Sequence, residues 1–324
     1  MDALSDVLRV IRLTGGLFLH AEFTAPWCIT SHIESSFRGP LLANSEQVML
    51  YHYVREGNLR VKLKGEAEVD IPPGHAVLFP ENDIHVMGSS LGLAPVAFSS
   101  LLGEGPKRGL AQVRHGGGGA RTRIVCGFLG IESKLANPLA TTLPKLLSVD
   151  LREGPTAQWM RHTLEFAADQ GAASQPGADG VIAKVSEVIF LEAMRRYIES
   201  LPPEQTGWLA GLRDPVIGRA LGLLHGDVRR AWTVEELGRE VGASRSTIAE
   251  RFTGLVGESP MQYLAGWRMR LAAQQLRSSG APLARIARDV GYESEAAFIR
   301  AFRRQFGAPP GSWRRGLKRP AAQA

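Results

Sequence analysis

Apolar and polar residues alternate along much of the first 150 positions. Leu59, Val61 and Leu63 are separated by basic residues, and the segments 17–23 and 69–71 repeat the same period of two. Several of these segments are bounded by glycine or proline. A period of two between such turn residues is typical of half-buried antiparallel strands. The pattern predicts a small β-barrel or β-sandwich.

From about residue 155 the spacing of apolar residues becomes helical. The stripe from Val181 to Leu201 is too wide for a helix that lies alone on a surface, so we expect it to pack on the β domain and on a partner. Periodicity leaves two alternatives open, a helix buried within one subunit and a dimerisation helix. The Gly-, Ala- and Ser-rich stretch 170–180 predicts a loop. We assign residues 151–214 to a helical linker and dimerisation region.

The last hundred residues contain an internal repeat. Six positions recur after fifty residues: Ser244, Ile248, Phe252, Gly257, Pro260 and Tyr263 match Ser294, Phe298, Phe302, Gly307, Pro310 and Trp313. Three more recur after forty-nine: Leu237, Val241 and Gly242 match Ile286, Val290 and Gly291. Such self-similarity indicates that one supersecondary unit is used twice.

Each copy has the pattern of a helix, a turn and a second helix. In the first copy, Thr233 and Glu236 have the spacing of a capping box, and Gly242 can adopt the positive φ of a tight turn. The pattern predicts two helix-turn-helix motifs, at about 233–255 and 283–306.

The segment between the two copies has helical apolar spacing over 260–276, which predicts one stiff linker helix. Such a connector would let one chain read two major-groove segments about 34 Å apart. We therefore expect an all-α domain at 215–320 and an α+β fold for the whole chain.

Charge supports this division of the chain. From Pro215 to Ala324 there are 18 basic and nine acidic residues, whereas the first 214 residues hold 20 basic and 23 acidic ones. The whole excess of positive charge therefore lies in the repeated region. Charge alone leaves a solvated basic face as the alternative, but together with the repeat it favours binding to double-stranded DNA.

The early exposed positions of the second helix in each copy are the base-reading candidates, because that part of the motif enters the major groove. They are Ser246, Thr247, Ala249, Glu250, Glu295, Ala296, Ile299 and Arg300. Arg300 stands out, since a guanidinium can bond O6 and N7 of guanine together. Four arginines are expected on phosphates instead: Arg245, Arg251, Arg303 and Arg304. For each of these, a solvated arginine is the alternative.

The stretch from Trp232 to Arg315, above all GYESEAAFIRAFRRQFG, resembles the DNA-binding domain of AraC-family bacterial transcription regulators. The first 150 residues resemble, more loosely, the cupin-like sensor domains that precede it in one branch of that family, through HYVREGN and GHAVLFPENDIH. The resemblance implies a cytoplasmic homodimer that binds promoter DNA, acts with RNA polymerase, and works more often as an activator than as a repressor. It also implies a small-molecule effector.

The ligand set of metal-binding cupins is incomplete here. His52 and His85 are present, but Val54 stands where a second histidine of the first motif would be. Both histidines are expected on strands and are our candidates for an effector pocket, and with Glu56 or Glu81 they could hold a metal weakly. The alternative is a pair of structural histidines, and we assign no cofactor.

The two cysteines, Cys28 and Cys126, both lie in the β-rich part. They form no disulfide framework and have no zinc-site spacing. A redox switch that pairs them is one hypothesis, and two buried apolar side chains are the alternative.

Three functions fit these observations. The first is a DNA-binding regulator whose β domain senses a small-molecule or redox signal; the others are a cupin enzyme tethered to nucleic acid and an architectural DNA-binding protein. The incomplete ligand set and the lack of GxSxG, HExxH or P-loop patterns argue against an enzyme. The near-neutral first domain argues against an architectural protein. No apolar run approaches the roughly 20 residues of a membrane span, so we expect no membrane partner.

Overall fold

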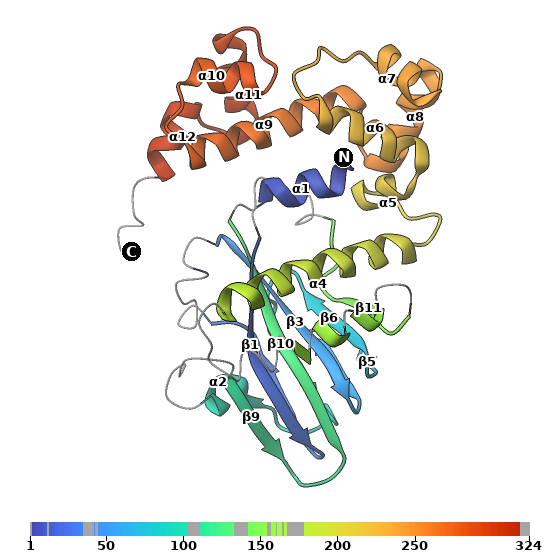
Figure 1. The fold of residues 1–324 in the computed structure, drawn as a ribbon, viewed down its shortest axis with the longest axis vertical. Coiled ribbons are helices and arrows are strands. Elements are labelled where there is room, and N and C mark those ends of the chain that lie inside the picture. Colours follow the sequence, from blue (N-terminus) through green and yellow to red (C-terminus); the bar gives the residue numbers. More distant parts are fainter. Residues whose placement is uncertain are drawn as a thin grey trace. The chain divides into compact units, whose positions relative to one another are not determined.

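The computed structural model describes residues 2–11, 13–34, 42, 45–102, 111–132, 142–153, 157–159, 161–163, 165–166 and 178–317. These residues divide into two compact units (Figure 1). We call the part between residues 13 and 200 the β unit. The helical unit consists of residues 2–11 and 201–317.

The larger sheet of the β unit contains six of the described strands. In spatial order they are β11 (Leu147–Asp150), β6 (His75–Phe79), β3 (Gln47–Glu56), β10 (Arg121–Ile131), β1 (Leu13–Thr24) and β9 (Ala111–Gly116). Neighbours are antiparallel except for β1 and β9, which are parallel. The glycine-rich segment 116–119 is the turn that joins β9 to β10.

Five strands in the described part of the chain form the smaller sheet. In spatial order they are β5 (Val69–Ile71), β4 (Leu59–Leu63), β7 (His85–Gly88), β2 (Cys28–Ser31) and β8 (Val96–Ala97). Along β4, buried and exposed residues alternate strictly, as the sequence pattern predicts. A short helix, α2 (Phe98–Leu101), follows β8.

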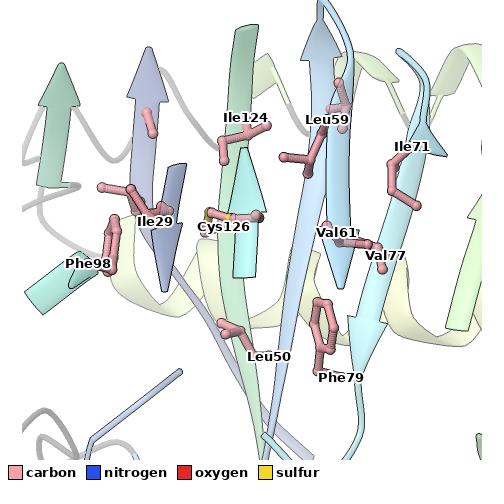
Figure 2. Close-up of a cluster of buried hydrophobic side chains, with 14 of the residues drawn as sticks. Ile29, Leu50, Leu59, Val61, Ile71, Val77, Phe79, Phe98, Ile124 and Cys126 are labelled. Atoms are coloured by element: carbon pink, nitrogen blue, oxygen red, sulfur yellow. The ribbon is translucent and has the colours of Figure 1, made fainter. Parts of the chain in front are cut away.

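Apolar side chains from both sheets meet in one core (Figure 2). Leu50, Phe79 and Ile124 come from the larger sheet, and Ile29 and Val61 come from the smaller one. All five are fully buried. The hydrophobic effect therefore holds the two sheets face to face as a sandwich.

Along the described residues the two sheets do not join into a closed barrel, so of the two predicted architectures the barrel is wrong and the sandwich is observed. β9 and β11 are the edges of one sheet, and β5 and β8 are the edges of the other. The edge strands β5 and β8 have only three and two residues, so they offer few backbone groups for a further strand pair. Alternation specifies the face that a residue presents, whereas closure depends on pairing at the edges.

The helix α4 (Ala178–Ser200) packs on the larger sheet, against β1, β10 and β11 (Figure 1). It confirms the helix predicted from Val181 onward but begins earlier, so 178–180 are helical and not part of a loop. The rest of the predicted loop, 170–177, lies outside the described residues. Close packing requires Gly15, since a Cβ there would lie 2.6 Å from the carbonyl oxygen of Ala183. The Tyr51 hydroxyl also lies 3.1 Å from Ser186 Oγ.

The helical unit contains nine described helices. They are α1 (Ala3–Ile11), α5 (Trp208–Arg213), α6 (Pro215–Gly226), α7 (Val234–Val241), α8 (Arg245–Val256), α9 (Pro260–Ser278), α10 (Leu283–Asp289), α11 (Glu295–Phe306) and α12 (Pro310–Leu317). The N-terminal helix α1 packs on α6, and it buries Leu4, Val7 and Val10.

Helices α7 and α8 form the first helix pair. The side chains of Thr233 and Glu236 cap α7 reciprocally, which confirms the predicted capping box. Gly242 ends α7 with a φ of +73°, and Ser244 accepts a hydrogen bond from the Thr247 N–H at the start of α8.

Helices α10 and α11 form the second helix pair, which repeats this geometry. Gly291 lies after α10 with a φ of +82°, and Ser294 caps α11 by accepting from the Ala297 N–H. Gly257 and Gly307 end α8 and α11 in the left-handed conformation. The same residues therefore make the same turns in both copies.

The helix α9 confirms the predicted linker helix. Its Tyr263 and Trp267 are almost completely buried. The Tyr263 hydroxyl accepts from Trp208 Nε1 at 2.7 Å and, having one proton of its own, donates it to His225 Nε2 at 2.7 Å. The Tyr263 ring also meets Phe252 of α8 edge-on. The first helix pair is thus fixed to the linker helix by an aromatic cluster in which the Tyr263 hydroxyl is hydrogen-bonded on both sides.

Candidate nucleic-acid interface and buried polar triad

The first turns of α8 present small polar side chains to solvent. Ser246, Thr247 and Glu250 are exposed, whereas Ile248 and Phe252 on the opposite face are completely buried. Ala249 lies between these extremes. The helical period therefore divides α8 into a core face and a free face, and the candidates lie on or beside the free face.

Two of these hydroxyl groups also belong to the cap of α8. Ser244 Oγ lies 3.0 Å from Ser246 Oγ and 2.8 Å from Thr247 Oγ1. Each hydroxyl can donate once and accept twice, so both retain bonding capacity for a base edge. The cap holds the two side chains in place.

Helix α11 carries stronger charge on its free face. Glu295, Ala296 and Arg300 are exposed, while Ile299 is half-buried against the core of the second helix pair. Phe298 and Phe302 are fully buried beneath. Arg300 therefore has a rigid helix behind it and free space in front of it.

Three of the four phosphate candidates, Arg245, Arg303 and Arg304, are exposed. Arg251 is exposed as well but forms an ion pair with Asp214, with Nη2 and Oδ2 2.5 Å apart. Asp214 also caps α6 by accepting from the Val216 and Ile217 N–H groups. Partial burial raises the pKa of this carboxyl, but these hydrogen bonds and Arg251 lower it below its usual value overall. Arg251 is thus held against the start of α6.

The β unit contains a hydrogen-bonded set of buried polar side chains, which we call the polar triad: Cys126, His52 and His85. His52 lies in the middle, with Nδ1 2.8 Å from Cys126 Sγ and Nε2 2.9 Å from His85 Nε2. His85 Nδ1 lies 2.9 Å from the carbonyl oxygen of Asp83. All three side chains are at most 1% exposed.

The protons of the polar triad can be assigned from its last member. A carbonyl oxygen only accepts, so His85 Nδ1 carries a proton and, in the neutral ring, His85 Nε2 is bare. His52 Nε2 must then donate, which leaves His52 Nδ1 as the acceptor for the Cys126 thiol. Protons therefore point from Cys126 toward Asp83, and every polar group in the series is paired.

Burial keeps the polar triad uncharged. It lowers the pKa of His52 well below its ordinary value, with a further contribution from His85. It lowers the pKa of His85 to about 4, although the hydrogen bond to Asp83 opposes this. It raises the pKa of the Cys126 thiol. The free-energy cost of burying a charge in this apolar core would exceed the stabilisation from the hydrogen bonds.

The two histidines lie together as buried, hydrogen-bonded side chains, and the carboxylates considered with them have other partners. Glu81 accepts from Gln47 Nε2 at 3.1 Å, and Glu56 forms an ion pair with Arg123 at 3.2 Å. Cys126 and His85 contact opposite nitrogens of His52, so the three do not converge on one point. Within the described ranges, no three metal-ligating side chains gather in one place.

The second cysteine points away from the polar triad. Ile29 packs in the core with Cys126, and neighbouring residues of a strand face opposite sides of a sheet. Cys28 therefore lies on the other face of β2, where burial raises its thiol pKa. Both cysteines are free and buried.

Comparison with known proteins identifies both parts of the chain. Residues 2–199 match the family described as Cupin, and residues 237–316 match the family described as Helix-turn-helix domain. A Streptomyces antibioticus protein named as an AraC-like transcription regulator is 33% identical over 97% of this chain and 99% of its own length. The chain belongs to the family of AraC-like transcription regulators.

Two further relatives of this AraC-like regulator match along nearly their whole length. The HTH-type transcriptional regulator AlkR of Acinetobacter baylyi is 28% identical over 97% of this chain and 99% of its own. The RCS-specific HTH-type transcriptional activator RclR of Escherichia coli K12 is 26% identical over 99% of this chain and all of its own. The solved DNA-binding domain of AdpA with a target DNA is 29% identical over 34% of this chain and 99% of that one, with a TM-score of 0.32.

Family membership settles the coarse choice among the three functions. The relatives are transcription regulators rather than enzymes, and the helix-turn-helix domain makes DNA a partner of this AraC-like regulator. Among its described helices, none combines the length and the apolar composition that crossing a bilayer requires.

Besides the contact of Cys126 with His52, sequence reasoning missed three further polar contacts of this regulator. These are the pairing of Asp214 with Arg251, the contact of Tyr51 with Ser186, and the hydrogen bonds of Arg268 to two backbone carbonyls. Each joins residues at least 35 positions apart. A proline after Asp214 was the one local signal, because Asp-Pro marks a helix start.

Proposed function

We propose that this protein is a sequence-specific regulator of transcription whose two helix pairs act as two helix-turn-helix motifs on adjacent segments of promoter DNA. The observation that carries this proposal is that α8 and α11, in the basic part of the chain, have the same capped geometry. Each of these helices also has one exposed face. Residues 215–320 are then the DNA-binding domain.

The linker helix supports two-site binding. α9 has 19 residues and so spans about 28 Å, close to one turn of B-DNA. It is capped at its start by Ser259 and Gln262, and it buries residues along its whole length. A rigid spacer of this length suits recognition helices that enter consecutive major grooves.

The positions of the arginines along α11 suggest different roles for them. Arg300 lies on the free face near the middle of the helix and would read guanine, while Arg303 and Arg304 in the last turn would contact phosphates. On α8, Ser246, Thr247, Ala249 and Glu250 are the base-reading candidates, with Arg245 and Arg251 on the backbone. On α11, Glu295, Ala296 and Ile299 complete the set.

Gel-shift titration of the full chain on the footprint upstream of its own gene tests this proposal. Arg300→Ala should cost about 1 to 3 kcal/mol on the footprint sequence and much less on random DNA. Arg303→Ala is the matched control and should weaken binding to both duplexes alike. Equal losses on both duplexes for Arg300→Ala would refute its base-reading role, and a wild-type chain that shifts no duplex at low salt would refute the proposal itself.

We propose that the β unit is the sensor domain and that its small-molecule or redox signal acts through the polar triad. The supporting observation is that each member depends on the next. If hydrogen peroxide oxidises the Cys126 thiol to a sulfenic acid, with release of water, or if a ligand displaces the thiol, the S–H donor to His52 Nδ1 is lost. The relative RclR is named as an RCS-specific transcriptional activator, which favours activation over repression for this protein as well.

The cysteine variants separate the two thiols. Cys126→Ala removes the donor to His52, whereas Cys28→Ser changes a side chain on the opposite face of β2. Reporter output from the regulated promoter, measured with and without peroxide, should lose its response only in Cys126→Ala. Replacement of both cysteines by Ser with an unchanged response would exclude the redox signal.

We propose that α4 carries the signal and forms the homodimer contact. Tyr51 and Gly127 adjoin His52 and Cys126 on β3 and β10 and lie on the α4 side of the sheet, where the Tyr51 hydroxyl meets Ser186. On the far side of α4, Val181 and Val188 are 44% and 38% exposed. Val188→Asp should yield a monomer by light scattering without unfolding the chain, and an unchanged dimer would count against this contact.

A further inference from the structure

Three segments of the helical unit meet at one side chain, Arg268 of α9. The first segment is the connection 227–232 between α6 and α7. The second is the linker helix itself, and the third is the turn of the second helix pair at Gly291 and Tyr292. The connection 227–232 leads into the first helix pair, and the turn at Gly291 and Tyr292 belongs to the second helix pair. The linker helix lies between the two pairs in the sequence.

Arg268 ties the linker helix to the connection 227–232 by two hydrogen bonds. Its Nε donates to the carbonyl oxygen of Val228 at 2.9 Å, and its Nη2 donates to that of Arg230 at 2.8 Å. The side chain is half-buried, and this burial lowers its pKa although it remains a cation. The planar guanidinium can reach both carbonyls at once because its donors diverge in a fixed fork.

The connection 227–232 is in turn anchored to the first helix pair. The Arg230 guanidinium lies 3.9 Å from the centre of the Trp232 ring and 3.4 Å from Glu240 of α7. Trp232 Nε1 donates to the carbonyl oxygen of Asp227 at 3.0 Å, which closes the connection on itself. A shift of the connection would therefore move α7 with it.

The second helix pair touches the same place through its turn. A Cβ on Gly291 would lie 2.8 Å from the Val228 oxygen and 2.9 Å from Arg268 Nη2, so the turn lies directly on both. The Tyr292 ring centre is 5.8 Å from Arg268 Cζ, within the range of a cation–π contact. This turn immediately precedes α11, so its position sets the start of that helix.

We propose that Arg268 is a positioning residue that fixes the two recognition helices relative to each other and thereby sets the preferred distance between the two DNA half-sites. The inference rests on the proposed two-site reading of DNA. When two modules bind one target, the gain over a single module depends on whether the geometry of the link matches the spacing of the sites. Arg268 supplies that match without touching DNA.

The test compares whole sites with half-sites. The probes are duplexes that the full-length wild-type protein selects from a random pool, each with the selected spacing, with one base pair inserted or deleted between the half-sites, or with one half-site scrambled. Arg268→Gln should bind the selected duplex about tenfold more weakly, bind the single half-site as wild type does, and lose the preference for one spacing. Arg268→Lys should regain little, since one ammonium group cannot replace the fork.

Arg270→Gln is the matched control, because it removes the same charge from the same helix. It should keep the wild-type spacing preference. Thermal unfolding of each variant reports any loss of fold. Tyr292→Leu removes the ring that faces Arg268, together with its edge contact to Phe298, and should shift the spacing preference in the same direction as Arg268→Gln.

The outcomes separate this inference from the proposed function. Equal losses of Arg268→Gln on whole and single half-sites, or an unchanged spacing preference, would overturn the positioning role while leaving two-site reading intact. A wild-type protein that gains nothing from the second half-site would overturn the proposed two-site reading itself.

Discussion

The β unit and the helical unit hold their candidate chemistry in opposite places. In the helical unit the base-reading candidates on α8 and α11 lie on free helix faces above aromatic cores. In the β unit the polar triad lies inside the sandwich, where every group has a partner. DNA is a large partner and can only be met at a surface, whereas a buried network can respond to a small chemical change and pass it on through packing.

The largest loss of stability is expected when the central side chain of the polar triad, His52, is removed. His52→Ala leaves the Cys126 thiol and His85 Nε2 buried without partners and opens a cavity between them. We expect the free energy of unfolding of the β unit to fall by about 3 to 5 kcal/mol, measured by urea denaturation of the full chain. His115→Ala, at a half-exposed histidine of β9, is the control and should cost less than about 1 kcal/mol. Similar losses in both variants would mean that the triad is not a network.

Acid should weaken the β unit because its histidines are buried without charge. The pKa of His85 is about 4 in the folded chain, below its ordinary value of 6.5, so the unfolded chain binds the extra proton first. The stabilisation is complete above about pH 6.5 and is lost as the pH falls toward 4, by up to about 3 kcal/mol.

The helical unit shares this sensitivity at one residue, His225, whose pKa burial lowers to about 3. Hydrogen exchange followed by mass spectrometry reports on each unit separately. Between pH 7 and pH 5 we expect faster exchange in β3 and β7 and around the aromatic cluster of α9. Exchange that is independent of pH, after correction for its intrinsic rate, would contradict neutral burial of these histidines.

The smallest effect is expected at the surface of the helical unit. Thr233→Ala removes one side-chain oxygen from the capping box of α7 and should cost about 1 kcal/mol of stability, measured by thermal unfolding. Because α10 has no side-chain cap at its start, the matching change Pro282→Ala should remove no hydrogen bond. A loss as large as that of His52→Ala would mean that the helical unit depends on its surface as the β unit depends on its interior.

Local rules explain how much of the fold the sequence predicts. The capping box at Thr233, the left-handed turns at Gly242 and Gly291, and the linker helix all depend on residues within a few positions of each other, and the structure confirms them. The period of two along β4 likewise predicts its buried face. The base-reading and phosphate candidates stay predictions, although the structure leaves most of them exposed.

Long-range contacts explain the failures. Alternation alone could not tell a closed barrel from two open sheets, because that choice depends on which strand edges meet. The pairing of Cys126 with His52 depends on the register between β3 and β10, and no local pattern encodes it. Likewise, nothing in the sequence indicated that Arg268 contacts the connection 227–232, because its partners lie about 40 positions away.

The amino-acid sequence by itself determined the repeated helix pairs, their caps and turns, and the concentration of positive charge around them, because these follow from backbone preferences and spacing over a few residues. Only the tertiary structure decided that the described strands form two separate sheets and that a thiol and two histidines form hydrogen bonds in the core. It also decided that one arginine joins three segments. Those outcomes depend on packing between residues far apart in the chain, where a buried polar group is tolerated only beside a partner that folding brings to it.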